Sequence, residues 1–193
     1  MYQNLKRHIQ EVVNVSQSDF NLFISKTKLV QLEKNETWKS EGKISQELAF
    51  VNSGLLRHFY MDNGDEKTEK FYQEGTWVGD FGSFLSNTLS LRNYSAIEKS
   101  ELFVLNFSEI QNLMPKIPVM ERFGRLNAEN LLLEQMNRNR SFLLDDAKTR
   151  YVKFKLDFPE LQQIIPQYLI AQYLSIKPET LSRIRKKLID IDQ

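Results

Sequence analysis

The feature that most constrains the fold is a 20-residue pattern that begins at Gln167, close to the end of the chain. Apolar residues fill positions 4, 8, 10, 15 and 18 of this frame and a small residue fills position 5, namely Ile170, Leu174, Ile176, Leu181, Ile184 and Ala171. Such positions form the small core between two short helices that cross at a steep angle, and the small residue lets the helices approach closely. The pattern predicts a helix-turn-helix within residues 167–188.

Two further residues of the frame lie where the chain must turn and start again. Ser175 stands where glycine usually turns the chain between the two helices, and serine tolerates turns, although less readily at positive φ. Pro178 suits the first turn of a helix, where its missing N–H has no partner to lose. We therefore expect the second helix to begin near Pro178.

The second helix is basic, although the chain as a whole is almost neutral. The formal net charge is +1, whereas five basic residues and one acidic residue lie between Lys177 and Lys187. A local excess of this kind is typical of an element that binds the phosphate backbone of DNA. The alternative is a solvated terminal helix whose basic end complements the helix dipole.

The first half of the chain changes its periodicity once. Within residues 1–27 apolar residues recur at helical spacing, and a second short helix is expected over Gln17–Lys26 with a flanking serine as its cap. Residues 28–107 instead contain short alternating runs, clearest from Leu55 to Met61. The Asn63-Gly64 pair favours a tight hairpin, because both central residues of that turn need positive φ. Many short strands with regular turns predict an antiparallel barrel or jelly roll.

A long helix is predicted over Val119–Leu144, followed by a helix over Ala147–Leu156 with Asp145-Asp146 as its cap. One stripe of the long helix carries Val119, Phe123, Leu126 and Leu133. Leu131 and Leu132 widen the apolar surface beyond one face, which predicts burial against both the barrel and a partner helix. The alternative is an amphipathic helix that packs only within its own subunit.

Several chemistries lack the residues that they need. The chain has no cysteine, which excludes disulfides, thiolate metal sites and thiol nucleophiles. A metal-binding jelly roll needs a cluster of histidines, but His58 is the only histidine in the strand region, and we expect His8 to lie at the surface. We therefore expect no enzyme, metal site or cofactor. The absence of an apolar signal segment or spanning segment predicts a cytoplasmic protein.

Four segments resemble the Crp/Fnr (catabolite-activator type) family, especially its short form common in Bacteroidetes-type bacteria: ELAFVNSGLLRHFY, EGTWVGDFGSFL, ERFGRLNAENLLLEQM and IAQYLSIKPETLSRIRKKL. The resemblance implies an α+β chain in three parts. Residues 1–117 would form a cyclic-nucleotide-binding-like sensor barrel with N-terminal helices, residues 118–144 a dimer helix, and residues 145–193 a DNA-binding domain. Because the chain ends shortly after the second helix, the winged helix is expected to be reduced.

The resemblance also implies which residues contact DNA. The family reads bases with an Arg-Glu-x-x-x-Arg pattern, of which Glu179 and Arg183 match the last two positions, while Pro178 replaces the first arginine. Glu179 would accept from a cytosine amine, and Arg183 would donate to guanine O6 and N7. The other residues assigned to this interface, as candidates for phosphate contacts, are Lys177, Thr180, Ser182, Lys186 and Lys187.

An effector pocket is implied by the same resemblance. Ligand-binding relatives hold the ribose with a Gly-Glu-x-Gly-type turn and the phosphate with an Arg-Ser pair. The corresponding residues here are Gly79, Asp80, Gly82, Ser90 and Arg92, with Gln135 on the long helix near the purine. The acid is shorter, the arginine is displaced by two residues, and the helix lacks the usual hydroxyl pair. These three departures argue against cyclic AMP as the effector.

The expected partners are double-stranded DNA and a second copy of the chain, bound through residues 119–144. An unidentified small-molecule effector and RNA polymerase are further candidates. The alternative is a jelly-roll module that binds a ligand or a protein without reading DNA. Salt dependence would separate the two, because specific DNA binding weakens steeply as salt rises.

Overall fold

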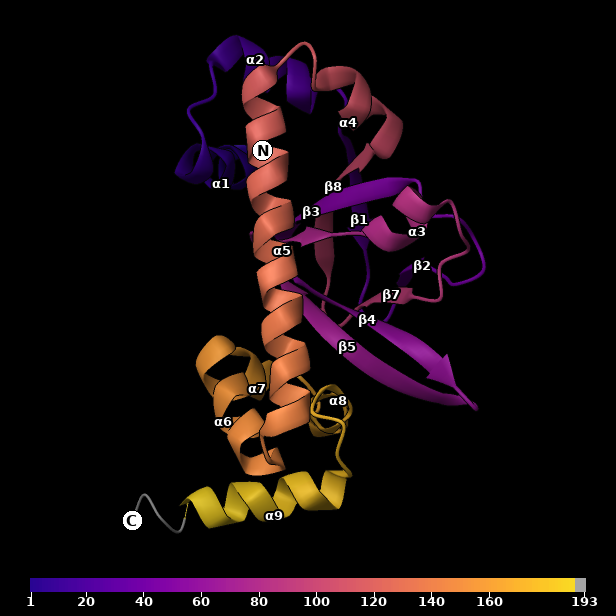
Figure 1. Ribbon diagram of the computed structural model, residues 1–193, viewed down its shortest axis with the longest axis vertical. Helices are drawn as coiled ribbons and strands as arrows, with labels where there is room; N and C mark the ends of the chain where they lie inside the picture. The colour runs from indigo at the N-terminus through magenta and orange to yellow at the C-terminus, as the bar shows by residue number, and fades with distance from the viewer. Residues whose placement is uncertain (190–193) are drawn as a thin grey trace. The chain divides into compact units, whose positions relative to one another are not determined.

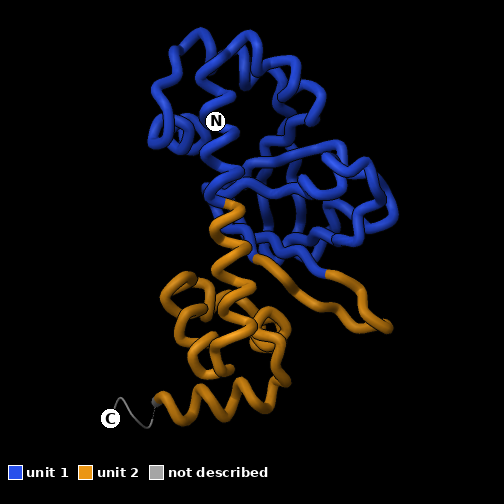
Figure 2. The backbone as a smooth tube through the Cα atoms, viewed as in Figure 1, with its two compact units in different colours: residues 1–59, 71–130 blue, residues 60–70, 131–193 orange. Residues whose placement is uncertain are grey.

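The computed structural model describes residues 1–189, and its internal contacts divide the chain into two compact units (Figure 2). Unit 1 comprises residues 1–59 and 71–130, and unit 2 comprises residues 60–70 together with residues from 131 onward. Residues 190–193, the end of the predicted DNA-binding domain, lie outside the described residues.

Two four-stranded sheets form the jelly roll that the sequence predicts (Figure 1). The first sheet has the order β1 (Lys28–Leu32), β8 (Ser100–Asn106), β3 (Glu47–Ser53) and β6 (Trp77–Val78). The second has the order β2 (Thr37–Lys39), β7 (Asn93–Ala96), β4 (Leu55–Asp62) and β5 (Asp65–Gln73). One apolar cluster takes side chains from both sheets, among them Leu102 of β8 and Leu56 of β4, so the sheets share a core.

The connection between β4 and β5 is the hairpin predicted from its Asn-Gly pair. Asn63 has φ 53° and Gly64 has φ 91°, as the tight turn requires. The short link between β3 and β4 depends on a glycine in another way. At Gly54, φ is 92° and an added Cβ would lie 2.3 Å from Ser100 Oγ, so this position has no room for a side chain.

The alternation predicted along Leu55–Met61 is wrong as a guide to burial. Every residue from Leu55 to Phe59 is buried, including Arg57 and His58. Both polar side chains have interactions inside the protein: the Arg57 guanidinium lies 4.1 Å from the Phe59 ring centre, and His58 Nδ1 lies 2.8 Å from the Tyr72 hydroxyl. Because these groups are satisfied internally, the strand can be buried on both faces.

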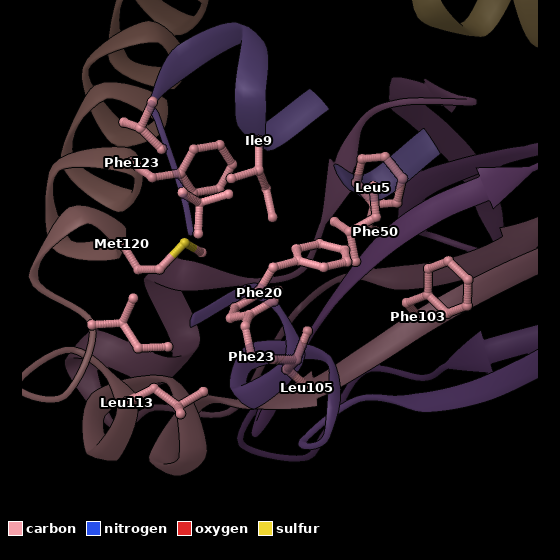
Figure 3. Packing of buried hydrophobic residues seen from close by; sticks show 13 residues of the cluster. Leu5, Ile9, Phe20, Phe23, Phe50, Phe103, Leu105, Leu113, Met120 and Phe123 are labelled. Atoms are coloured by element: carbon pink, nitrogen blue, oxygen red, sulfur yellow. The ribbon is translucent and has the colours of Figure 1, made fainter. Parts of the chain in front are cut away.

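Helices cover the first sheet of unit 1 and share a second apolar cluster with it (Figure 3). They are α1 (Gln3–Val12), α2 (Gln17–Ile24), α4 (Phe107–Leu113) and the first part of α5 (Pro118–Leu144). The Ser16 hydroxyl caps α2 by accepting from the backbone of Asp19 at 3.1 Å. Met120 and Phe123 of α5 pack in this cluster with Phe50 of β3. The apolar stripe predicted on the long helix thus lies, at Val119 and Phe123, in the core of its own subunit.

Among the described residues, unit 2 contains the end of the β4–β5 hairpin, the rest of α5 and four further helices. These are α6 (Ala147–Asp157), α7 (Leu161–Ile164), α8 (Gln167–Tyr173) and α9 (Pro178–Ile189). The carboxylate of Asp146 caps α6 through the backbone N–H of Thr149 at 2.8 Å, as predicted from the acidic pair. Among the described helices, none is both long enough and apolar enough to cross a membrane.

Candidate nucleic-acid interface and effector pocket

The turn between α8 and α9 closes at Ser175. This residue has φ 52°, in the left-handed region that glycine usually occupies after a helix. The N–H of Ile176 donates to the carbonyl of Ala171 at 3.0 Å, and the N–H of Ser175 donates to Gln172 at 2.9 Å. These bonds use carbonyls that the end of α8 would otherwise leave unpaired. The turn therefore forms with serine in the glycine position, and α9 begins at Pro178 as predicted.

The core between the two helices contains the residues that the 20-residue frame predicts. Four of them are each 1% exposed, namely Ile170, Ala171, Leu174 and Leu181. Ile176 and Ile184 are half-buried at its edge. The helix-turn-helix is therefore confirmed as a structural element of unit 2.

The residues assigned to DNA lie at the surface of this element. Six are exposed, namely Lys177, Glu179, Ser182, Arg183, Lys186 and Lys187, and Thr180 is half-buried. Glu179 and Arg183 are four residues apart on α9 and so share one face. The Arg183 guanidinium donates to the Thr180 hydroxyl at 3.3 Å, which gives the arginine a partner within α9 before any ligand is bound.

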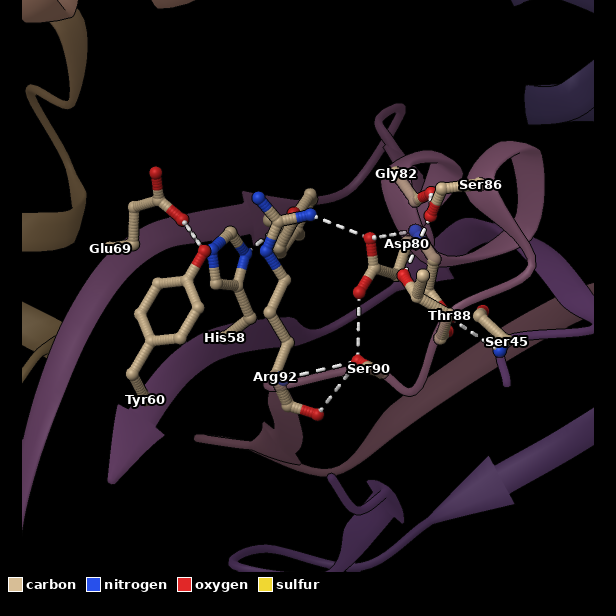
Figure 4. Close-up of polar contacts among 12 residues, drawn as sticks. Ser45, His58, Tyr60, Glu69, Asp80, Gly82, Ser86, Thr88, Ser90 and Arg92 are labelled. Atoms are coloured by element: carbon tan, nitrogen blue, oxygen red, sulfur yellow. Dashed lines mark hydrogen bonds and ion pairs between the residues drawn. The ribbon is translucent and has the colours of Figure 1, made fainter. Parts of the chain in front are cut away.

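In unit 1 the turn residue Asp80 is the centre of a closed polar network (Figure 4). Its side chain is almost fully buried and both of its oxygens accept hydrogen bonds. One oxygen accepts from Arg92 Nη1 at 2.9 Å and from the backbone N–H of Ser83 at 3.1 Å; the other accepts from Ser90 Oγ at 2.7 Å. The bond to Ser83 also caps helix α3 (Phe81–Ser86), where the sequence indicated only a turn. Ser90 and Arg92 therefore reach the same carboxylate.

The surrounding backbone is packed closely around this network. Ser83 Oγ donates to the carbonyl of Thr88 at 2.6 Å and accepts from the N–H of Ser45 at 2.9 Å. At Gly79 an added Cβ would lie 3.1 Å from a backbone oxygen of β3, and at Gly82 it would lie 3.3 Å from the Asp80 carboxylate. The two glycines thus allow close approach. Gln135 lies half-buried on α5 in unit 2, and its assignment to the pocket stays a prediction.

Comparison with known proteins agrees with this architecture. Residues 29–116 match the cyclic nucleotide-binding domain family. The structure of the c-di-GMP-responsive global regulator CLP of Xanthomonas campestris is similar over 92% of this chain and 93% of its own, with 16% identity and a TM-score of 0.72. A CooA structure from Carboxydothermus hydrogenoformans is similar over 88% of this chain and 79% of its own, with 13% identity and a TM-score of 0.72.

A third structure is also similar to this chain. It is a putative Crp/Fnr-family transcriptional regulator from Eubacterium rectale, similar over 91% of this chain and 85% of its own, with 15% identity and a TM-score of 0.68. The chain has the fold of these three structures. Among curated protein sequences, none matches this chain. The fold predicted from the sequence is therefore confirmed, and residues 29–116 belong to a stretch that matches the cyclic nucleotide-binding domain family.

The polar groups around Asp80 do not fit a cyclic nucleotide as they stand. The carboxylate that would accept from the ribose already accepts three hydrogen bonds, and the arginine that would hold the phosphate is paired with that carboxylate. A cyclic phosphate would have to separate a buried ion pair before it could bind. The structure thus agrees with the sequence in arguing against cyclic AMP.

Both histidines have roles that the sequence did not reveal. His58, labelled in Figure 4, pairs with Tyr72 and has its ring 5.5 Å from that of Tyr94. His8 was expected at the surface, but it is half-buried and its Nε2 accepts from the Trp77 indole N–H at 3.2 Å. Burial lowers the pKa of His8, and the nearby Glu11 opposes this effect. Both contacts join segments far apart in sequence, which local patterns do not report.

Proposed function

We propose that this protein is a sequence-specific, DNA-binding transcription regulator of the Crp/Fnr type that acts as a homodimer in the cytoplasm. The observation that carries the proposal is the helix-turn-helix, whose second helix is anchored by the buried Leu181 and exposes a basic face. Residues 1–117 would act as the sensor, residues 118–144 as the dimer helix, and residues 145–193 as the DNA-binding domain.

Base readout is assigned to Glu179 and Arg183, which project from one face of α9. A glutamate can accept from cytosine N4, and an arginine can donate to both acceptors of guanine. The remaining exposed residues of the interface would contact phosphates, which positions the helix without specifying sequence. Arg185 lies on nearly the opposite side of α9 from Arg183, because two residues cover about 200° of a helix.

The proposed dimer face lies on the second half of α5. Leu132, Met136 and Leu143 are 61%, 58% and 83% exposed, and their spacing of four and seven residues keeps them within one stripe. Asn139 lies in the same stripe and is exposed. An apolar stripe with one polar position is typical of a two-stranded helical contact, in which the polar residue fixes the register. A second copy of this chain would also provide the two-fold symmetry that a palindromic site requires.

The effector is assigned to chemistry other than a cyclic nucleotide. The internal pair between Asp80 and Arg92 occupies the groups that would hold a ribose and a phosphate. A ligand that changed the DNA affinity of the regulator would bind the sensor through other groups. RNA polymerase is the expected recipient of the signal.

The first experiment selects binding sites from random duplex DNA with the purified full chain. Arg183→Ala should cost about 1–3 kcal/mol on the selected site and relax the preference at one base pair. Lys186→Ala should weaken all sequences evenly. Arg185→Ala is the control, because it removes the same charge from the other side of α9. No selected sequence, together with weak salt dependence, would instead indicate a jelly-roll module without DNA readout.

The second experiment tests the dimer by light scattering against the 22.8 kDa monomer. Leu132→Glu with Met136→Glu places two charges in the apolar stripe and should yield a monomer that no longer binds the selected site. Asn130→Glu adds a charge on another side of α5 and should leave the dimer intact. A dimer that survives both substitutions would contradict the assigned face.

A further inference from the structure

Two arginine side chains meet at the end of α8, just before the left-handed Ser175. Arg138 of α5 donates to the carbonyl of Tyr173 at 3.2 Å. Arg150 of α6 donates to the carbonyl of Leu174 at 3.2 Å and to that of Asp145 at 2.8 Å. Neither arginine was assigned to the DNA interface. Together they bind the carbonyls of the last residue of α8 and of the C-cap residue that follows it.

One aromatic ring, that of Phe142, lies close to both guanidinium groups. The Phe142 ring centre lies 4.7 Å from Arg138 Cζ and 5.1 Å from Arg150 Cζ. Arg138 Cζ also lies 4.3 Å from the ring centre of Tyr173, and that ring packs against Phe154 of α6 at 5.5 Å. Burial raises the pKa of the Tyr173 hydroxyl, while the nearby Arg138 acts against this rise. These five residues connect α5, α6 and α8 at a single point within unit 2.

The two guanidinium groups stabilise the end of α8 in addition to packing against it. The final carbonyls of a helix lack partners within the helix and carry the negative end of its dipole, so cations stabilise them. An arginine that also stacks on aromatic rings can turn little, because its planar group has a fixed orientation. The two arginines therefore stabilise the negative end of α8 and fix the orientation of that end. Helix α9 starts four residues after Leu174.

We propose that Arg138 and Arg150 are positioning residues that set the orientation of α9 by holding the end of α8. This inference rests on the proposed DNA-reading function. The position of Ser175 gives the pair its importance, because a non-glycine residue in the left-handed region makes this turn less favourable on its own. The two arginines stabilise this turn from outside it, and a turn with glycine at this position would need less such stabilisation. Because Arg138 belongs to α5, the proposed dimer helix also aligns the reading helix.

The first test measures how firmly α9 is held relative to α6, without DNA. The chain has no cysteine, so spin labels can be attached at Leu156→Cys on α6 and Arg185→Cys on α9, both exposed positions. The distance distribution between the labels should be narrow in the parent protein and clearly broader in Arg138→Ala and Arg150→Ala. Arg140→Ala is the matched control, since it removes an exposed arginine from α5. Equal distributions in all four proteins would overturn the proposal.

The second test compares affinity for the selected site with affinity for scrambled DNA. Each alanine variant should lose on the order of tenfold on the selected site and much less on scrambled DNA, because a net charged hydrogen bond is worth about that ratio. Arg150→Lys keeps the charge but not the planar fork, so it should restore scrambled binding and leave specific binding weak. If the alanine variants do not fold, Arg150→Lys and the corresponding Arg138→Lys carry both tests.

The two proposals fail in different ways. A parent protein without any preferred sequence would contradict the proposed function, and the label distances would still decide the role of the arginines. A lysine variant with parental specificity and parental distances would overturn the positioning role while leaving DNA reading intact.

Discussion

The ion pair between Asp80 and Arg92 should stabilise the folded state of unit 1. We consider Asp80→Ala, which removes the acceptor for Ser83, Ser90 and Arg92 at once. A carboxylate kept for an absent ligand would destabilise the folded protein, and its removal would be neutral or favourable. A carboxylate that holds the α3 region to the following strand should instead cost stability when it is removed.

The size of the effect follows from the burial of the pair. The exposed fraction is 7% for the Asp80 side chain and 27% for that of Arg92. Removal of one partner from a fully buried pair costs about 3–5 kcal/mol, and partial exposure of Arg92 lowers this cost by letting water reach the guanidinium. We therefore expect Asp80→Ala to lower the free energy of unfolding by about 2–4 kcal/mol. In a double-mutant cycle with Arg92→Ala, the coupling should be about 1–2 kcal/mol.

Urea unfolding followed by tryptophan fluorescence measures this effect in unit 1, which contains Asp80. Both tryptophans of the chain, Trp38 and Trp77, lie in unit 1. The exposed pair Lys99–Glu33, with an Nζ–Oε1 distance of 2.7 Å, provides a control cycle in which little coupling is expected. If the buried pair shows no more coupling than this surface pair, the argument that the pocket is closed internally is refuted.

Three more predictions concern other parts of the chain. Gly54→Ala should cost roughly 3–5 kcal/mol, because its Cβ would meet three atoms within 2.6 Å around the start of β8; Gly75→Ala, at φ 83° in open space, should cost about 1–2 kcal/mol in the same urea assay. Burial lowers the pKa of His8 in the folded state, so neutral His8 contributes stability above about pH 6.5, and this contribution is lost as the pH falls through the folded pKa. In thermal unfolding, the loss of stability between pH 7.5 and pH 5 should therefore be smaller for His8→Gln than for the parent protein. Leu181→Ala, at a site 1% exposed, should cost unit 2 about 2–5 kcal/mol and abolish DNA binding in a gel-shift assay, with the tryptophan transition unchanged.

The helix-turn-helix could be predicted in detail because all of its determinants are local. Its core residues lie within 20 positions, and Ser175 and Pro178 mark the turn and the start of α9. Helix caps were predictable for the same reason, since Asp146 bonds to the backbone three residues later. The hairpin at Asn63 needed only two residues to specify its turn.

The interior of unit 1 was predictable only in outline. Burial of Arg57 and His58 depends on Phe59 and Tyr72, and the pattern along one strand does not reveal that a partner on another strand satisfies a polar group. The half-buried His8 is a similar case, because its partner Trp77 is 69 residues away. A helical period assigns an apolar face, but not which side of a helix a distant aromatic ring will cover.

The shift of one arginine changes what the pocket can do. In the resembling family the arginine and serine are adjacent, so a strand would direct them to opposite sides unless its backbone is irregular. Here Ser90 and Arg92 are two residues apart, and both reach the carboxylate of Asp80. The same three groups that would separate to receive a ribose and a phosphate thus bind one another. An effector that uses this region must supply enough binding energy to open a buried ion pair, which cyclic AMP would have to do without the usual hydroxyl pair on α5. Control of the proposed DNA reading by a ligand bound elsewhere, or by the proposed dimer helix through Arg138, needs no such opening.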